Sequence, residues 1–529
     1  MTKTHKPLQR IEEVRAQINI VRAGYNPELF GVALNQAKMP QFERDQLAAT
    51  KIISDMANRG VFFRDAETAY YLFIETGELM SIEGDGIPLS RFLNKYGLNA
   101  TEKIFKYIVE AIYQHSLECG ADTVVRHFAH LWFTEDGSPV LFIAMDNNRV
   151  LKVTPETISE VTNGTDGVLF LTESTACPEQ VKDYLKKPVD LLGPLMLDKI
   201  PFQTTDLNSE ESKFLFLCQI FSLFLKDLFD TNPIFAFIGE KGSGKTTAVR
   251  LIGNTLYGDD WDVCDVGNDQ KDFDAMVTSR PFVCLDNTDE YVKWLTNKLA
   301  IIASGGKIPR RILFKTNRFA DYPIIAMVAT TSRTPCFRRD DVADRLVILK
   351  TIRLSEIKNK DFDDDVLSDA VSHRIELWAE IIKKLQSILK VLSDPSWKDK
   401  RIRGVRLQGF ARFTWVVNEG LKCGVDVDAL WKKQQSMQVE FASENENLFD
   451  IIPIWIKENP ESQVTAGELN EELKRIARSR EIVWQHKSSF ALASRLSQLK
   501  SKLEAQFGMK VEIGTDNQNI YSFSKSLSR

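Results

Sequence analysis

The stretch IFAFIGEKGSGKTTAVRLIG, residues 234–253, decides how this chain folds. Residues 234–238 are all apolar and predict a buried strand, whereas the residues after Lys245 have the spacing of a helix. Between them, Gly239 to Thr246 match the pattern GxxxxGK followed by Ser or Thr. A strand, a glycine-rich turn and a helix in this order predict a loop that binds phosphate groups.

The chemistry of phosphate binding explains the residue types in this loop. Glycines let backbone N–H groups curl around a phosphate, Lys245 neutralises negative charge, and the Thr246 hydroxyl can bind magnesium. We therefore expect ATP and Mg²⁺ as cofactors. The predicted cofactor-binding residues are consecutive in the sequence: Gly239, Glu240, Lys241, Gly242, Ser243, Gly244, Lys245, Thr246 and Thr247.

A second apolar strand, in RPFVCLDNTDE (280–290), ends in Asp286. We predict that Asp286 and Thr246 hold the metal ion. The next residue is Asn287, which can orient a water molecule but cannot accept its proton. Three alternatives stay open: Asp289 or Glu290 reaches the water, Asn287 only positions it and the γ-phosphate accepts the proton, or turnover is slow.

A third apolar strand, in IIAMVATTSRTP (324–335), ends in hydroxyl groups where it would meet the γ-phosphate. Ser332 or Thr331 is therefore a candidate sensor of the nucleotide. The run CFRRDDVADRLVIL (336–349) follows and contains Arg338, Arg339 and Arg345. In a monomer these arginines would form surface ion pairs of little energetic value, whereas in a ring they could reach a neighbour's nucleotide.

The stretch GGKIPRRILFKTNRFADYP (305–323) predicts a cationic hairpin that turns near Lys315. Its basic residues can follow a phosphate backbone without reading base sequence. Phe314 and Phe319 either contact bases or, as we prefer, pack in the core. The predicted nucleic-acid-binding residues are Lys307, Arg310, Arg311, Lys315 and Arg318.

The length of 529 residues predicts several domains. We expect an α+β domain over 1–205 that binds DNA or a partner, and an α/β P-loop core with a parallel sheet over 206–355. A mainly helical segment should cover 356–445. Residues 446–529 have the order helix, helix, two-stranded wing, with 488–507 as one amphipathic helix, which predicts a winged helix for DNA or protein contact.

Composition limits the other possible classes. The net charge of −5 argues against a general polyanion binder, so any nucleic-acid contact must be local. Seven cysteines without a CxxC pair and three spaced histidines predict neither a zinc site nor a disulfide framework. The apolar run 214–225 is too short to span a bilayer, and the charged start shows no export signal. We expect a cytoplasmic protein with no membrane partner.

Taken in this order, the motifs resemble those of AAA+ ring helicases of phages and mobile genetic elements. They are similar to superfamily 3 viral helicases and, more distantly, to minichromosome maintenance helicases. The resemblance covers about residues 209–353 and extends through RLQGFARFTWVV (406–417), which is similar to the lid helix of that family. Two positions differ from the family: Asn287, and Ser332 where superfamily 3 members commonly have Asn.

The resemblance implies an ATP-dependent DNA helicase or translocase, most often a homo-hexamer, that serves replication of a phage or mobile element. It places the hairpin tip, residues 315–318, in the ring's channel against single-stranded DNA. It makes Arg345 the arginine finger, with Arg338 and Arg339 as second choices. Arg406 is either a second sensor arginine or a surface residue. A primase or initiator protein is a possible partner.

Asn287 also favours a different class, a nucleotide-switched initiator, loader or defence regulator without unwinding activity, because slow hydrolysis suits a switch. A third class, a P-loop kinase for small molecules, is disfavoured. The sequence lacks an evident acceptor site, and it contains the arginine run that acts between subunits.

Overall fold

The computed structural model describes residues 40–65, 68–82, 87–171, 177–187, 189–265, 270–289, 292–311, 319–334, 340–353, 362–443, 447–460, 462–480, 484, 486, 488–514 and 519–524. The chain divides into two compact units. The first comprises 1–288, 292–333 and 345–432, and the second comprises 289–291, 334–344 and 433–529.

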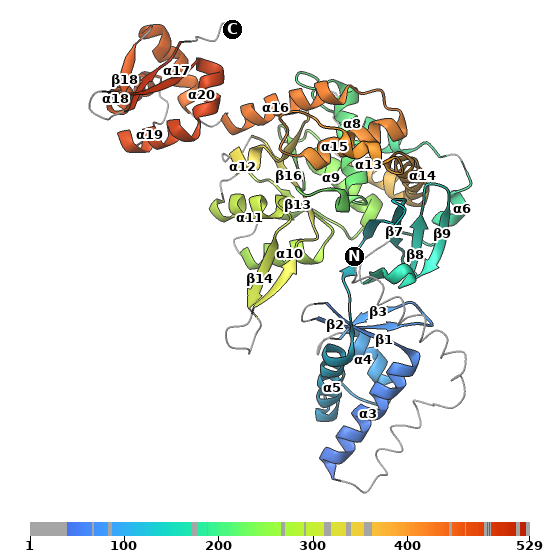
Figure 1. Cartoon of the computed structure of the whole chain (residues 1–529). Coiled ribbons are helices and arrows are strands. Elements are labelled where there is room, and N and C mark those ends of the chain that lie inside the picture. The colour runs from blue at the N-terminus through green and yellow to red at the C-terminus, as the bar shows by residue number, and fades with distance from the viewer. Residues whose placement is uncertain are drawn as a thin grey trace. The chain divides into compact units, whose positions relative to one another are not determined.

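A five-stranded parallel sheet forms the centre of the first unit (Figure 1). The strands, in sheet order, are β12 (Cys264–Asp265), β13 (Phe282–Asp286), β16 (Met327–Ser332), β11 (Ile234–Ile238) and β17 (Leu346–Lys350). The four longer strands are buried at nearly every position, as expected when helices cover both faces of a parallel sheet. Because all strands run in one direction, their carboxyl ends meet at a single edge.

Helices pack around this sheet in a mixed α/β arrangement. They are α8 (Ser209–Ser222), α9 (Lys245–Tyr257), α10 (Gln270–Ser279), α11 (Lys293–Ala303), α13 (Phe362–Ser372), α14 (Arg374–Leu392) and α15 (Gln408–Leu421). α14 holds the end of α9, since Trp378 Nε1 and Arg374 Nε donate to the Thr255 carbonyl at 3.0 and 2.9 Å. These bonds satisfy a carbonyl in the last turn of α9, one of the groups left without a partner inside the helix.

α8 begins with a capping box, in which Asn208 and Glu211 exchange side-chain to backbone bonds of 2.8 Å. Its apolar residues surround the helix and are buried, as the sequence predicts. Within the described part of the chain, no helix is both long and apolar enough to cross a membrane.

The amino-terminal part of the first unit contains a four-stranded sheet in the order β3-β2-β1-β4. Aromatic side chains from this sheet and its helices pack edge to face around Tyr71, Phe73 and Phe92. The elements are α3 (Gln41–Arg59), β1 (Gly60–Asp65), β2 (Thr68–Phe73), β3 (Leu79–Ser81), α4 (Ile87–Asn94), α5 (Lys103–Cys119) and β4 (Ala121–Asp122).

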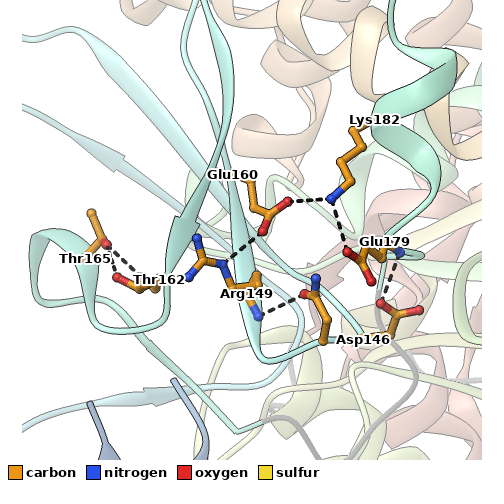
Figure 2. A network of polar contacts seen from close by, with 8 residues as sticks. Asp146, Arg149, Glu160, Thr162, Thr165, Glu179 and Lys182 are labelled. Atoms are coloured by element: carbon orange, nitrogen blue, oxygen red, sulfur yellow. Dashed lines mark hydrogen bonds and ion pairs between the residues drawn. The ribbon is translucent and has the colours of Figure 1, made fainter. Parts of the chain in front are cut away.

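A second, antiparallel sheet follows in the order β6-β7-β8-β9. Figure 2 shows how ion pairs fasten the next helix to it: Arg149 and Lys182 both donate to Glu160, at 2.9 and 3.2 Å. The elements are β5 (Val125–Arg126), which pairs with β10 (Leu169–Phe170), then β6 (Ala129–Phe133), β7 (Pro139–Ala144), β8 (Arg149–Val153), β9 (Ile158–Thr162), α6 (Val181–Tyr184) and α7 (Leu192–Leu195).

The second unit has its own core, built from a three-stranded antiparallel sheet and amphipathic helices. The predicted single helix over 488–507 is interrupted at Leu499, although its four leucines are all buried. The elements are α17 (Asn447–Glu458), β18 (Gln463–Thr465), α18 (Ala466–Ser479), α19 (Ser489–Gln498), α20 (Lys500–Phe507), β19 (Lys510–Ile513) and β20 (Asn519–Ser522). α16 (Val427–Ser443) spans the boundary between the units, and α12 (Asp340–Ala343) is a single turn.

Candidate nucleotide-binding site

The loop between β11 and α9 has a geometry that requires its glycines. Gly242 and Gly244 have φ angles of 76° and 78°, in the left-handed region that favours glycine. A Cβ atom on Gly239 would lie 2.4 Å from the Thr351 carbonyl oxygen, so no larger residue fits there. The backbone at the start of α9 is therefore left uncovered, as a phosphate-binding loop requires.

Lys245 is nearly enclosed, with 7% of its surface exposed. Its Nζ donates to the carbonyls of Gly239 and Glu240 at 2.7 and 2.8 Å. The ammonium group thus lies inside the curve of its own loop, bonded to backbone oxygens that phosphate oxygens would replace. A buried cation beside the amino end of a helix fits the phosphate groups of a nucleotide.

Three donors converge on the carboxylate of Asp286. Its Oδ1 accepts from the hydroxyls of Thr246 at 2.9 Å and Thr331 at 2.5 Å, and its Oδ2 accepts from Asn287 Nδ2 at 3.1 Å. A carboxylate beside a threonine hydroxyl offers the oxygen ligands that Mg²⁺ prefers. In the described residues, no cluster of three His, Cys, Asp or Glu side chains could hold a metal ion by itself. A magnesium ion bound by Thr246 and Asp286 would take further ligands from phosphate oxygens.

Asn287 adopts a left-handed backbone conformation, with φ of 53°, which asparagine tolerates better than most residues. Its backbone N–H donates to Thr331 Oγ1 at 3.1 Å, while its side chain turns to Asp286. An Asp or Glu side chain at position 287, when ionised, could not donate the hydrogen bond that Asn287 Nδ2 gives to Asp286. Glu290 lies outside the described residues and Asp289 belongs to the second unit, so the alternatives for the proton acceptor stay predictions.

The two sensor candidates, Thr331 and Ser332, have different surroundings. The Thr331 hydroxyl joins Asp286 to the Asn287 backbone, and its carbonyl accepts from Thr288 N at 2.8 Å. Ser332 is buried, and its Oγ has no hydrogen-bond partner within the described part of the chain. The carbonyl of Ser332 accepts from Gly239 N at 3.2 Å, at the start of the loop. Thr331, not Ser332, is therefore the hydroxyl bonded to the Asp286 carboxylate.

Sequence reasoning missed Thr351 and Arg353, which follow β17. Thr351 Oγ1 lies 2.8 Å from Ser243 Oγ, and its backbone N–H donates to Ile238 O at 2.8 Å. Arg353 is exposed and lies close to the loop: a Cβ atom on Gly242 would be 3.9 Å from its Nε. No motif marks these residues, because only the pairing of β17 with β11 brings them to the loop.

Arg345 lies at the opposite, amino-terminal edge of the sheet. It is 8% exposed, and its Nη1 donates to the Ala300 carbonyl at 3.1 Å. A role on a neighbour's nucleotide requires the guanidinium to turn out of this contact with α11. Arg338 and Arg339 lie outside the described residues, and Arg406 is exposed two residues before α15.

The predicted cationic stretch forms an antiparallel strand pair, β14 (Lys307–Arg311) with β15 (Phe319–Pro323). Ile308 is buried and anchors the pair, whereas Lys307 is exposed. The backbones of Arg310, Arg311 and Phe319 are described but their side chains are not. Phe314, Lys315 and Arg318 lie outside the described residues.

No protein-family model matches this chain, and no curated protein matches it significantly. The solved structures similar to it include SCCmec type IV Cch, described as an active helicase, with a TM-score of 0.44 and 12% identity over 88% of this chain and 93% of that chain. The apo NrS-1 C-terminal region gives 0.41 and 10% over 91% and 99%. JCV helicase gives 0.21 and 10% over 43% and 60%. These similarities are weak, so the function rests on the site itself.

Proposed function

We propose that this chain is an ATPase of the AAA+ ring-helicase type that moves single-stranded DNA. The observation that carries the proposal is the convergence on Asp286 of Thr246 and Thr331, next to a loop that encloses the Lys245 ammonium group. The Lys245 cation, the Asp286 carboxylate proposed to bind the metal ion and the uncovered start of α9 lie at the same edge of the sheet. This set is what ATP hydrolysis with Mg²⁺ needs.

Each residue has a distinct part in the proposed reaction. Backbone N–H groups of the loop and Lys245 would bind the phosphates, and Thr246 and Asp286 would hold a magnesium ion, whose charge would offset that of the phosphate oxygens. Thr331 and Asn287 keep the Asp286 carboxylate oriented. Asn287 is the residue next to Asp286 that can orient the attacking water.

The connection between β15 and β16 supports the proposal that ATP hydrolysis moves the hairpin. β15 ends at Pro323 and β16 begins at Met327, so the hairpin leads within three residues into the strand that bears Thr331. Ile325 N and Ala326 N both donate to Val277 O at 3.1 Å and fix this connection. A shift of β16 after hydrolysis would therefore be passed to the hairpin, where Lys307, Arg310, Arg311, Lys315 and Arg318 would contact phosphates.

The remaining assignments belong to the same proposal. The molecule would act as a homo-hexamer in the cytoplasm, in replication of a phage or mobile element, with Arg345, Arg338 or Arg339 reaching a neighbour's nucleotide. Residues 356–445 would form the lid, and 1–205 would bind DNA or a primase or initiator partner. The order of α17 to β20 supports a winged helix over 446–529.

A nucleotide switch without unwinding activity is the second candidate function. It is favoured by Asn287, whose side chain bonds Asp286 and supplies no proton acceptor. Such a protein would change its assembly state on binding ATP and hydrolyse it slowly.

Steady-state ATP hydrolysis with and without single-stranded DNA separates the two. For the helicase we expect stimulation by DNA that disappears in Lys245→Ala and in Lys315→Ala. Lys390→Ala, on the exposed face of α14, should behave as wild type. Slow hydrolysis that does not respond to DNA would instead support the switch.

A further inference from the structure

A short segment between α8 and β11, residues 226–232, contacts both ends of the hairpin. It begins with η3 (Lys226–Leu228), a single turn of 3-10 helix. Lys226 Nζ donates to the carbonyls of Ile324 and Ile325, both at 2.9 Å, in the connection between β15 and β16. Segment 226–232 therefore holds the end at which the chain leaves the hairpin.

Asn232 holds the other end, at which the chain enters the hairpin. Its backbone N–H donates to Ala303 O at 2.7 Å and its Nδ2 donates to Ile302 O at 3.3 Å, at the end of α11. The next element after α11 is β14, the first strand of the hairpin. Because Asn232 is only 4% exposed, water hardly competes for these bonds. Both ends of the hairpin are thus bonded to one segment.

Asp227 bonds the same segment to the amino-terminal sheets. Its Oδ2 accepts from Leu131 N at 2.8 Å and lies 3.0 Å from His130 Nδ1, both on β6. Arg126 of β5 adds an attraction, since its Nη1 lies 4.0 Å from Asp227 Oδ1. Burial raises the pKa of Asp227, but these bonds and charges lower it by more, so the carboxylate is ionised near pH 7.

The two links start from consecutive residues of η3. Backbone bonds close this turn: Leu228 N donates to Leu225 O at 3.1 Å, and Phe229 N donates to Lys226 O at 3.0 Å. One turn thus bonds the hairpin through Lys226 and β6 through Asp227. A displacement at either partner therefore reaches the other.

The enclosure of Lys226 distinguishes it from an ordinary surface lysine, whose ammonium group is directed to water. Burial lowers the pKa of Lys226 to about 8, so enclosing its charge costs free energy. The bonds to Ile324 O and Ile325 O offset part of this cost. These carbonyls belong to the connection that leads from the hairpin into the strand bearing Thr331.

We propose that segment 226–232 couples the hairpin to residues 126–131, with Lys226 as the positioning residue on the hairpin side and Asp227 on the other side. Displacement of the hairpin, by DNA or by a shift of β16, would then be passed to β6, and contacts of residues 126–131 would bias the hairpin in turn. The coupling is a property of the folded chain. Its effect on hydrolysis rests on the proposed function, because that effect requires DNA on the hairpin.

Hydrogen exchange of the full-length protein tests the coupling without ATP or DNA. Asp227→Ala removes the acceptor of Leu131 N, and we expect Ile325 and Ala326, across the segment, to exchange at least about fivefold faster than in wild type. Their own bonds to α10 are untouched by this substitution. Lys226→Met should have the reverse effect, so that Leu131 also exchanges faster.

Asp183→Ala is the matched control, because Asp183 is exposed on α6 and does not contact segment 226–232. Lys226→Arg should keep wild-type exchange at Leu131, since a guanidinium group can donate to both carbonyls. The amides of β11 should exchange as in wild type in every variant and thus report an intact fold. If each variant changes exchange only on its own side, the proposal is overturned. If Lys226→Met fails to fold, Asp227→Ala decides by itself.

Steady-state ATP hydrolysis tests the effect on the proposed reaction. Lys226→Met should keep the rate without DNA within about twofold and lose the stimulation by single-stranded DNA, whereas Lys226→Arg retains it. Lys390→Met, on the exposed face of α14, is the control. Full stimulation in Lys226→Met would overturn the positioning role. Absence of stimulation in wild type would contradict the proposed function instead, and hydrogen exchange alone would then decide the coupling.

Discussion

At the carboxyl edge of the central sheet, the Asp286 carboxylate accepts from two side-chain hydroxyls, whereas at the amino edge the Lys226 ammonium group and the Arg345 guanidinium donate to backbone carbonyls. Asp286 gathers Thr246 and Thr331, which lie 40 and 45 residues away in the chain. Lys226 at the other edge bonds Ile324 O, 98 residues away. The carboxyl edge is recognisable because its residue types are specific, while a carbonyl partner leaves no trace in sequence.

The largest effect should come from Asp286→Asn. The amide keeps the shape of the side chain but loses the charge that would bind Mg²⁺ in the proposed reaction, and several kcal/mol of transition-state stabilisation correspond to at least about a hundredfold in rate. Steady-state ATP hydrolysis measures the loss. Asp369→Asn, on the exposed face of α13, is the control and should retain the wild-type rate. If Asp286→Asn lost less of the hydrolysis rate than variants of the amino edge, the carboxyl edge would not be the site of the reaction.

The neighbouring threonines of β16 offer a matched pair. Thr331→Val leaves Asn287 N–H without its acceptor and removes one of the three donors to Asp286, and should lower the free energy of unfolding by about 1–3 kcal/mol. Thr330 is 1% exposed, and its hydroxyl has no hydrogen-bond partner in the described part of the chain. Thr330→Val should therefore be neutral or stabilising. Urea denaturation compares the two, and equal losses would contradict the assigned coupling.

Much of the carboxyl edge could be predicted from sequence because local patterns specify it. The apolar run 234–238, the glycines after it and the strand ending at Asp286 all form as expected. The hairpin strands and the helix near 406–417 are also present, the latter as α15. Each depends on residues close together in the chain, where period and turn chemistry act directly.

The remaining features depend on strand order, which sequence does not reveal. Thr351 meets Ser243 only because β17 lies beside β11, and their separation is 108 residues. The sequence around Arg345 resembles that of an arginine finger, but tertiary packing encloses the side chain against the Ala300 carbonyl. The interruption at Leu499 was also missed, because the four leucines keep a helical spacing across it.

Asn287 gives a smaller effect that isolates backbone strain at the carboxyl edge. Asn287→Gly and Asn287→Ala both remove the bond to Asp286 Oδ2, but only alanine must hold φ of 53° at a steric cost. We expect the alanine variant to be less stable than the glycine variant by roughly 1–2 kcal/mol. Paired urea denaturations measure the difference. Equal stabilities would mean that the turn after β13 relaxes and does not fix Asp286.

The smallest effect concerns acid stability at the amino edge, where the His127 ring is partly buried. Burial lowers its folded pKa from 6.5 to about 4. Between these values the unfolded chain binds more protons than the folded one, so stability falls as pH decreases from 6.5 to 4. His127→Gln should reduce the stability lost between pH 6.5 and 4 by roughly 1 kcal/mol or less, because solvent reaches part of the ring. Urea denaturation at several pH values measures the slope.

His373→Gln, on the exposed turn before α14, is the control for this titration and should keep the wild-type slope. A slope unchanged in His127→Gln would mean that the imidazole gains a proton without leaving its place. The folded amino edge would then accommodate the protonated imidazole. A flattened slope would show that the folded amino edge disfavours a charge on this imidazole, unlike the carboxyl edge, whose groups would bind a charged ligand in the proposed reaction.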